Sequence, residues 1–414
     1  MKRYPTYLIL LTVALSLIGG VLLDRTVLPA VIPPSGLSPD AAPAFHLMTE
    51  AWNTLEQHYV DRAALQPQRL ADGAISGMVD ALGDTGHSRF LTAAEAQQEQ
   101  NALQGQFVGI GAEIQQSNGQ LVVVAPLDGS PAQQAGLRPG DVILRVNGAD
   151  ITNLPLEQVL SQIQGPAGTA VTLTLLDPAT GHTRDVTLVR AQIALHNITW
   201  QRLPGTSVAH LRLAAFSQGV GAELRAALAD MQQHLTGIIL DLRNDPGGLL
   251  DEAIAVASQF LRSGNVLLEQ NAQGQITPMP AQAGGAAPSI PLVVLVNQGT
   301  ASSAEVVTGE LRDAHRATIV GATTFGTGTV LNQFALSDGS VLLVATEEWL
   351  TPNGRTIWHH GLTPDDVVAL PPNALPLRPE TEQAITPEQL RTSTDTQLLR
   401  ALDLLAPTNA TDSR

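Results

Sequence analysis

The sequence predicts an α/β fold in which a β-rich domain is inserted between an N-terminal helical segment and a core of alternating strands and helices. Short apolar runs predict the core, because strands buried in a parallel sheet are apolar along their whole length. Apolar residues at helical spacing between 249 and 261 predict a helix that packs on this sheet. The expected core strands are residues 208–213, 237–243, 292–297, 317–321 and 340–347.

The chain of 414 residues is long enough for several domains. The last of the expected segments contains one helix, at 387–405, which could cap the core or mediate self-association. The expected segments are a membrane anchor or signal segment (1–25), a proline-rich linker (26–44), an N-terminal helical region (45–99), a β-rich domain (100–192), an α/β core (193–370) and a C-terminal tail (371–414).

Charge and composition exclude several classes of function. With 22 basic and 38 acidic residues the formal charge is −16, which argues against nucleic acid or an anionic membrane surface as partner. Cysteine is absent, so there is neither a disulfide nor a thiolate nucleophile. The adjacent pair His359 and His360 lacks further ligands at zinc spacing. We therefore expect no metal and no cofactor.

The N-terminus predicts export. Lys2 and Arg3 precede an uncharged, mostly apolar run at 7–23, whose 17 residues lie at the short end of a membrane-spanning helix. A cleaved signal peptide is the alternative, although no convincing cleavage site follows the run. In both cases the positive flank stays in the cytoplasm and the rest is extracytoplasmic, either anchored or secreted.

The β-rich domain contains a long signature at residues 128–148, which combines a short helix, a turn that ends in glycine, a strand and an Asn-Gly hairpin turn. This run resembles that of a PDZ domain. The resemblance implies that the backbone N–H groups of Gly109, Ile110 and Gly111 bind the carboxylate of a protein or peptide C-terminus, which adds as a strand. The alternative is that these glycines only permit a tight turn.

A serine lies where a buried strand meets a helix. The strand at 291–297 is followed by a helical pattern that starts near Ser303, so the hydroxyl of Ser302 lies near helix N–H groups and the positive end of the helix dipole. A second strand ends in the glycine-rich turn at 244–248, which could direct N–H groups at an oxyanion. The alternative for this turn is a helix N-terminus shaped only for packing.

These motifs, together with the turn at 324–330, resemble those of the C-terminal processing peptidases (tail-specific proteases), in family order from residue 45 to about 370. The resemblance implies a crotonase-like core and a serine–lysine dyad whose nucleophile is Ser302. It also implies an oxyanion hole made by Gly247 or Gly248 and by Ser303. Glu305 matches a family glutamate, which we interpret as an orienting or capping group.

The sequence differs from the family pattern at two positions that the catalytic mechanism needs. Thr327 occupies the position of the family lysine, and the sequence contains no lysine except Lys2. A threonine hydroxyl cannot take a proton as a neutral amine does. Leu331 occupies the position of the supporting glutamine. Gln333 is near in sequence, and it shares a strand face with Leu331 only if no bulge intervenes.

A histidine could replace the missing base. The candidates are His210, His315 and the pair His359–His360, although a lone histidine is more often structural. His87 lies in a turn at 83–91 that resembles a family turn, and we interpret it as a turn or packing residue. Two hypotheses stay open, an exported C-terminal processing serine peptidase and a non-catalytic adaptor that binds C-termini. The sequence specifies neither the substrate nor the oligomeric state.

Overall fold

The computed structural model describes residues 38–406, except 85–86, 118–119, 127–129, 139, 152–153, 155, 179, 195–196, 232–234 and 372–373. The expected membrane or signal segment at 7–23 lies outside the described residues. Within the described part of the chain, no helix is both long and apolar enough to cross a bilayer.

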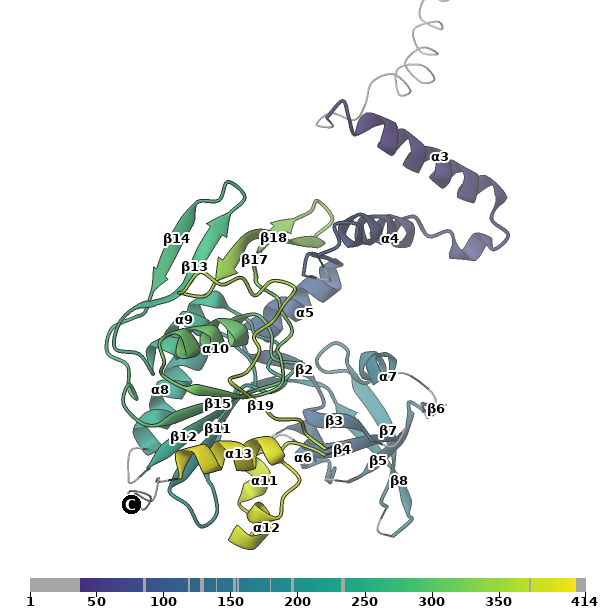
Figure 1. Cartoon of the computed structure of the whole chain (residues 1–414). Coiled ribbons are helices and arrows are strands. Elements are labelled where there is room, and N and C mark those ends of the chain that lie inside the picture. Colours follow the sequence, from purple (N-terminus) through teal and green to yellow (C-terminus); the bar gives the residue numbers. More distant parts are fainter. Residues whose placement is uncertain are drawn as a thin grey trace, which may run out of the picture. The chain divides into compact units, whose positions relative to one another are not determined.

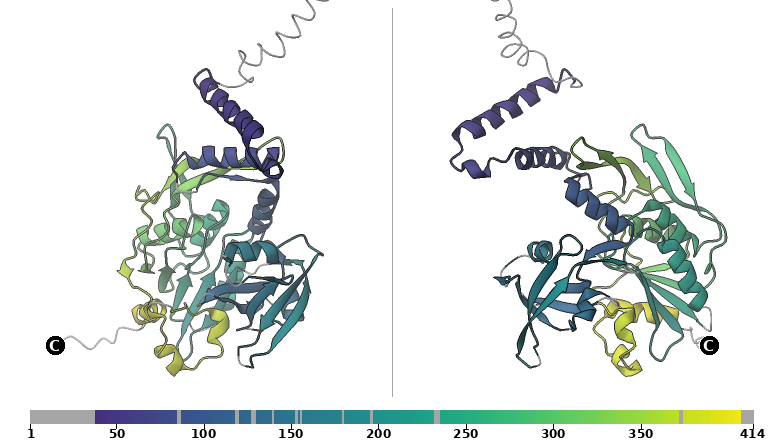
Figure 2. Two further views of the ribbon diagram at one scale, coloured as in Figure 1. Left: turned by 90° about the vertical axis from the view of Figure 1, so that its right-hand side faces the viewer. Right: turned by 180° about the vertical axis from the view of Figure 1, so that it is seen from behind.

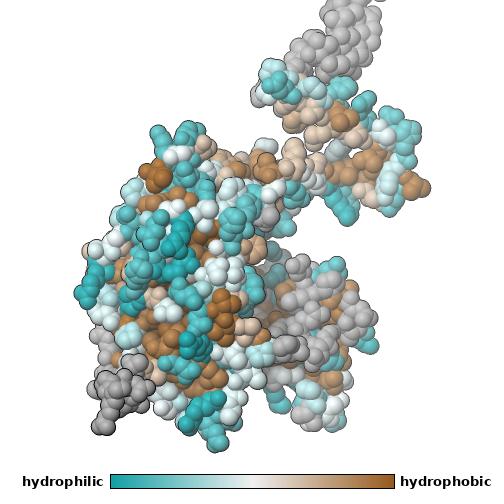
Figure 3. Space-filling view, in the orientation of Figure 1, coloured by the Kyte–Doolittle hydropathy of each residue, from teal (hydrophilic) through white to brown (hydrophobic). Residues whose placement is uncertain are grey.

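Contacts within the chain divide it into two units, residues 1–75 and 76–414. The described part of the first unit contains α3 (Ala42–His58), the short 3-10 helix η2 (Arg62–Ala64) and the beginning of α4 (Pro67–Asp80). Helix α3 has no buried residue. Apolar side chains of this unit, such as Leu47 in α3 and Val60 just after it, are exposed, and Figure 3 shows brown surface on this part of the chain.

In the second unit, the expected PDZ region forms an antiparallel sheet with the strand order β3-β4-β5-β7-β8, in which β6 also pairs with β5. Helix α7 contributes Val159 and Ile163 to a core that includes Val123 and Leu173 of the sheet. The elements are β3 (Ala112–Ser117), β4 (Gln120–Pro126), α6 (Pro131–Gln134), β5 (Val142–Val146), β6 (Ala149–Asp150), α7 (Leu156–Ile163), β7 (Ala170–Leu176) and β8 (Thr183–Val189), flanked by the paired strands β2 (Gln106–Gly109) and β9 (Ala191–Ala194).

A mostly parallel sheet is the centre of the α/β core (Figure 1). Its strand order is β10-β11-β12-β15-β16-β19, and only the β10–β11 pair is antiparallel among the described pairs. Every residue of β12 and β15 is buried, as the apolar sequence of β15 and of β12 before Asp241 predicts. The strands are β10 (Ile198–Arg202), β11 (Val208–Leu213), β12 (Gly237–Asp241), β15 (Leu292–Val296), β16 (Thr318–Gly321) and β19 (Asp366–Val367).

Helices cover both faces of this sheet (Figures 1 and 2). On one face lie α8 (Val220–Met231), α9 (Leu250–Ser258) and α10 (Ser303–Asp313), whose apolar residues form one core with the sheet. On the other face, α13 (Thr396–Leu405) buries Leu398 and Ala401 against Val293, Leu295 and Val320. The core is therefore a three-layer structure, and the carboxyl ends of β12 and β15 lie side by side.

A second, antiparallel sheet joins segments that are far apart in the sequence. Strand β1 (Arg89–Leu91) pairs with β18 (Val341–Leu350), which also pairs with β13 (Asn265–Asn271) and β17 (Thr329–Ala335), while β14 (Ile276–Pro280) pairs with β13. Helix α5 (Ala93–Leu103) follows β1 and begins at a capping box made by Thr92 and Glu95.

The prediction of a single helix at 387–405 is wrong. The C-terminal segment (residues 374–406) instead contains α11 (Pro379–Glu382), α12 (Pro387–Arg391) and α13. The helix is interrupted between α12 and α13 because the Asp395 side chain accepts the N–H of Leu398 and caps the start of a new helix. A capping carboxylate satisfies helix N–H groups only at a helix start, so Asp395 opposes a continuous helix.

Candidate active site

Ser302 lies between β15 and α10 in a strained conformation. Its φ is +50°, a value that L-residues other than glycine rarely adopt, so the surrounding contacts must hold it. The preceding N–H, that of Ala301, donates to the carbonyl of Asp245 at 2.9 Å. A Cβ placed on Gly247 would lie 2.7 Å from the Cβ of Ser302, so only glycine fits against the serine.

Glu305 joins the Ser302 turn to the turn at 324–327. Its carboxylate is fully buried and accepts the N–H of Ser302 at 3.0 Å and that of Thr327 at 2.9 Å. It also accepts the N–H of Gly326 at 2.8 Å and the hydroxyl of Thr324 at 2.5 Å. Burial raises the pKa of the Glu305 carboxyl, although these hydrogen bonds oppose that rise. All these contacts orient the two turns, as expected for an orienting group.

Thr327, which we expect at the position of the family lysine, lies directly beside Ser302. Its Oγ1 accepts the N–H of Ser302 at 3.2 Å, so the side chain is adjacent to the serine backbone. Leu331 and Gln333 line the same cavity as Ser302. The register between β17 and β18 shifts between Val330 and Leu331, where Thr346 of β18 is the extra residue, so the alternation between 331 and 333 is undisturbed.

The glycine turn (residues 244–248) lies against the start of α10. The Ser303 hydroxyl donates to the carbonyl of Gly248 at 2.9 Å and ties the two segments together. The N–H of Gly247 donates to Asp245 Oδ1 at 2.8 Å. Burial raises the pKa of Asp245 well above its usual range, although this hydrogen bond opposes the rise, and Asp245 Oδ2 has no partner among the described residues. Because the N–H of Gly247 already donates to Asp245, the N–H groups of Gly248 and Ser303 are better placed to bind an oxyanion.

Ser302 opens into a cavity of about 400 Å³, which we call the Ser302 cavity. Its walls are largely apolar, and an ion pair between Arg89 and Glu99, with 2.6 Å between nitrogen and oxygen, contributes to its lining. The apolar lining residues include Leu103, Leu249, Leu250, Val306, Phe325, Val330, Leu331, Leu343 and Trp349. Such walls suit an apolar side chain of an extended peptide.

His87 also lines the Ser302 cavity, which the sequence did not indicate. It is 5% exposed, and its Nδ1 lies 3.5 Å from the Thr329 hydroxyl. Its Nε2 is buried and has no hydrogen-bond partner among the described residues. Burial lowers the pKa of His87, which Asp84 raises in part and His359 lowers further. The imidazole is therefore neutral at pH 7 and can accept a proton. Only its place in the turn at 83–91 could have drawn attention to it.

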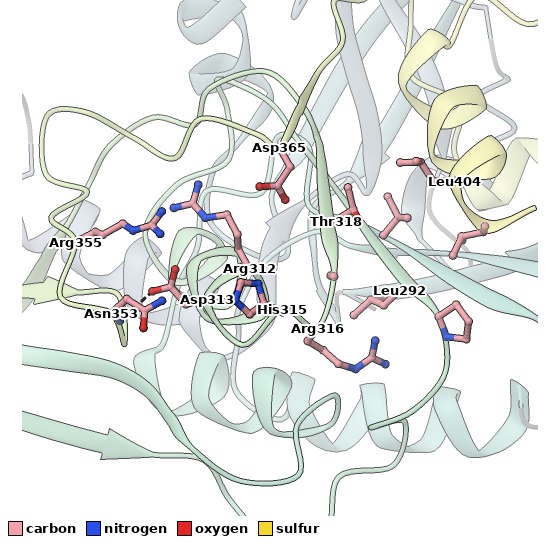
Figure 4. Close-up of a pocket in the computed structure, with 14 residues that line it drawn as sticks. Leu292, Arg312, Asp313, His315, Arg316, Thr318, Asn353, Arg355, Asp365 and Leu404 are labelled. Atoms are coloured by element: carbon pink, nitrogen blue, oxygen red, sulfur yellow. Dashed lines mark hydrogen bonds between the residues drawn. The ribbon is translucent and has the colours of Figure 1, made fainter.

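His359 stacks on His87 with 6.3 Å between the ring centroids, whereas His210 and His315 lie elsewhere. His210 is fully buried in β11, where its ring nitrogens bond Asp241 and Glu382. His315 lines a separate cavity of about 580 Å³ with Arg312 and Arg316 (Figure 4). The ring of His359 stacks on Trp358 with 4.6 Å between centroids, and neither it nor His360 is among the residues that line the Ser302 cavity.

In the PDZ domain, Gly109 is the last residue of β2, and Ile110 and Gly111 connect it to β3. The carbonyl of Ile110 accepts the N–H of Ala132 and that of Gly111 accepts the Ser130 hydroxyl, each at 2.8 Å. Gly111 has a φ of +71°, and a Cβ there would lie 2.3 Å from Ser130. The loop is thus fixed through its carbonyls at the start of β3, which is an edge strand of the described sheet.

A strained serine at a helix N-terminus, beside glycine N–H groups and an apolar cavity, is an arrangement suited to acyl transfer. The model of peptidase family S41 matches residues 207–368, and a PDZ model matches residues 122–177. The chain belongs to peptidase family S41, within the C-terminal processing proteases that carry a PDZ domain.

Two relatives support this membership. A carboxyl-terminal-processing protease from Synechocystis sp. is 37% identical over 360 residues, which cover 86% of this chain and 81% of that protein. A carboxy-terminal-processing protease from Bartonella bacilliformis is 36% identical over 310 residues, 73% of this chain and 70% of that protein. Among solved structures, a putative S41 protease from Bacteroides fragilis shares the fold, with a TM-score of 0.54, 18% identity, and coverage of 86% of this chain and 96% of that one.

Proposed function

We propose that this protein is a serine peptidase that binds protein C-termini through its PDZ domain and cleaves them with Ser302 as the nucleophile. The observation that carries the proposal is the conformation of Ser302, which is held at a φ of +50° at the start of α10, against the glycine turn. Strain at such a position is retained where function needs it. The N–H groups of Gly248 and Ser303 would bind the oxyanion.

We propose His87 as the general base in place of the family lysine. The Ser302 Oγ–H bond breaks as its proton passes to His87, and Oγ bonds to the peptide carbonyl carbon. The C–N bond then breaks as the proton moves to the leaving amine, and water hydrolyses the acyl-enzyme. Among the described residues no hydrogen bond joins His87 Nε2 to Ser302. The proton therefore passes through one water or after substrate tightens the site, as is common in free enzymes.

Removal of His87 tests this assignment. Cleavage of an unstructured peptide with an apolar C-terminus should vanish in Ser302→Ala and fall about 10²- to 10⁴-fold in His87→Gln. The control His360→Gln removes an exposed histidine that does not line the Ser302 cavity and should change little. Because burial lowers the pKa of His87, kcat/KM should fall only below pH 6.5, as His87 protonates. Cleavage that needs Ser302 but is unaffected by His87→Gln would refute the base.

The PDZ loop yields a separate prediction. Peptides with a free apolar C-terminus should bind the protein at least about tenfold more tightly than their C-terminally amidated forms, because amidation removes the carboxylate charge and one acceptor oxygen. Isothermal titration calorimetry on the Ser302→Ala protein measures this without cleavage. Equal affinities would contradict carboxylate recognition by Gly109, Ile110 and Gly111.

One observation favours a second function. Thr327 contacts Ser302 and Leu331 lines the Ser302 cavity. We assign these residues to the positions of the family lysine and glutamine, and neither side chain can act as a base. A protein without another base would capture C-termini as an adaptor. Intact binding of free C-termini combined with no Ser302-dependent cleavage would support this alternative.

We also propose that the protein is exported and held at the membrane by residues 7–23. The support is the apolar run behind Lys2 and Arg3, and a cleaved signal that releases a secreted form remains the alternative. Protein C-termini exposed outside the cytoplasm would then be its partners.

A further inference from the structure

A cluster of buried charges lies at the carboxyl end of β12, on the sheet face opposite α10. It consists of Asp241, Arg243 and His210 from the core with Glu382 and Asp395 from the C-terminal segment, and each is at most 2% exposed. We call these five residues the buried charge cluster. Removing such charges from water is costly, and packing of α13 on the sheet needs only apolar residues. The cluster therefore calls for an explanation beyond attachment of the C-terminal segment.

Arg243 is the centre of this cluster. Its Nε and Nη2 donate to both carboxylate oxygens of Asp241 at 2.6–3.1 Å, and its backbone N–H bonds Asp241 Oδ1 at 3.0 Å. Its Nη1 donates to both oxygens of Asp395, at 2.9 and 3.1 Å, and to Gln397 Oε1 at 3.2 Å. Such two-oxygen contacts fix the direction of a guanidinium plane and hence of the backbone that carries it.

Asp395 is fixed in turn by the C-terminal segment. Its Oδ1 accepts the N–H of Leu398 at 3.0 Å, and its Oδ2 accepts the N–H of Leu377 at 2.8 Å. Helix α13, which Asp395 caps, lies along the sheet below β12 and β15 (Figure 1). The position of this carboxylate is therefore set by two parts of the segment.

From Arg243 the chain runs directly into the glycine turn. Thr300 donates its hydroxyl to the carbonyl of Leu242 at 2.8 Å, and Ala301 donates its N–H to the carbonyl of Asp245 at 2.9 Å. A change at Arg243 would thus reach both segments that form the oxyanion site, the glycine turn and the turn before Ser302.

We infer that Arg243 and Asp395 are positioning residues, through which the C-terminal segment holds the glycine turn in its oxyanion-binding conformation. The inference rests on the proposed role of Gly248 in binding the oxyanion. The five charges give the end of β12 a single orientation, which apolar contacts, being non-directional, would not specify. The C-terminal segment then acts on the active site through Arg243 and the glycine turn, although none of its described residues lines the Ser302 cavity.

Hydrogen exchange tests the inference without catalysis. Asn is as good an N-cap as Asp, so Asp395→Asn keeps the cap of α13 and removes the charge that Arg243 needs. Exchange of the amides at 242–250 should rise at least about tenfold, whereas that of helix α8 stays unchanged. The conservative variant Asp395→Glu should restore part of the protection. The control Arg400→Gln breaks an exposed ion pair of α13 with Asp366 and should leave 242–250 unchanged.

Kinetics separate positioning from stability. In a protein that cleaves, Asp395→Asn should lower kcat at least about tenfold with KM nearly unchanged, because oxyanion contacts form only in the transition state. Uniformly faster exchange through the core, or unchanged exchange at 242–250, would overturn the inference. If Asp395→Asn does not fold, faster exchange at 242–250 in Asp395→Glu supports it and wild-type exchange there rejects it. If the wild type cleaves no peptide but Asp395→Asn still shows faster exchange at 242–250, the proposed function is rejected and the positioning role of Arg243 and Asp395 is kept.

Discussion

In the His87→Gln protein, peptide cleavage should rise about 10²- to 10⁴-fold when Thr327→Lys and Leu331→Gln are added together, because a general base is then supplied to a site that lacks one. Thr327 Oγ1 lies 3.2 Å from the N–H of Ser302, so a lysine at 327 begins beside the nucleophile and extends into the Ser302 cavity. Burial among the apolar walls lowers the pKa of the amine and supplies its neutral form. Leu331 lines the same cavity, and a glutamine there gives the amine an acceptor that fixes its direction.

The design of this experiment distinguishes the two bases. Each single variant should gain less than the double variant, because a lysine without the glutamine lacks its acceptor and a glutamine alone is no base. The gain should vanish with Ser302→Ala and be smaller when His87 is kept, since the lysine then joins a base that is already present. Initial rates on a fluorogenic peptide compare all these variants with the wild type. A folded double variant without a gain would show that the site has lost more than its base, which would favour the adaptor function.

Stability should fall as the pH rises from 6.5 to 9 because of His210. Burial alone would lower the pKa of His210, but hydrogen bonds to Asp241 and Glu382 and their negative charges raise it from 6.5 to about 9. A group whose pKa is raised by folding stabilises the protein fully below its unfolded pKa and loses this contribution as the pH passes its folded pKa. The shift corresponds to a loss of up to about 3 kcal/mol in the free energy of unfolding.

Urea denaturation at several pH values checks this expectation. At pH 6, His210→Gln should cost about 3–5 kcal/mol, because it leaves the buried Glu382 carboxylate without its cation and Asp241 with Arg243 as its remaining cation. The difference from the wild type should shrink as the pH rises towards 9 and above, when His210 loses its proton. The control His360→Gln, an exposed histidine, should show no such trend. A difference that stays constant from pH 6 to 9.5 would mean that His210 is neutral in the folded protein.

Much of the core could be predicted because its signals are local. The apolar run at 292–297 became β15, with one end residue different, since a strand buried on both faces is apolar along its length. The segment at 208–213 became β11 with the same bounds. The second sheet was missed except for β18. Strand β1 is only three residues long, and it is a strand because residues 89–91 pair with 341–343, a contact that no local pattern encodes. The same applies to β13 and β14, whose exposure is mixed.

The candidate site shows the same division. Its motifs placed Ser302, Thr327, Leu331 and the glycine turn in one region because each follows the end of a buried strand or lies in a tight turn. His87 was interpreted as a packing residue, since a histidine in a turn carries no signal of what the turn faces. Its burial in the Ser302 cavity depends on the pairing of β1 with β18.

By itself, the sequence determined the family, the PDZ domain, the serine at a helix start and the absence of any lysine beyond Lys2, because each is a matter of residue identity and short spacing. Only the tertiary structure decided which histidine lies in the Ser302 cavity, and that the C-terminal segment bonds Arg243 next to the glycine turn. These contacts join residues 152 or more positions apart. Their strength and their effect on pKa come from burial, and burial exists only once the chain is packed.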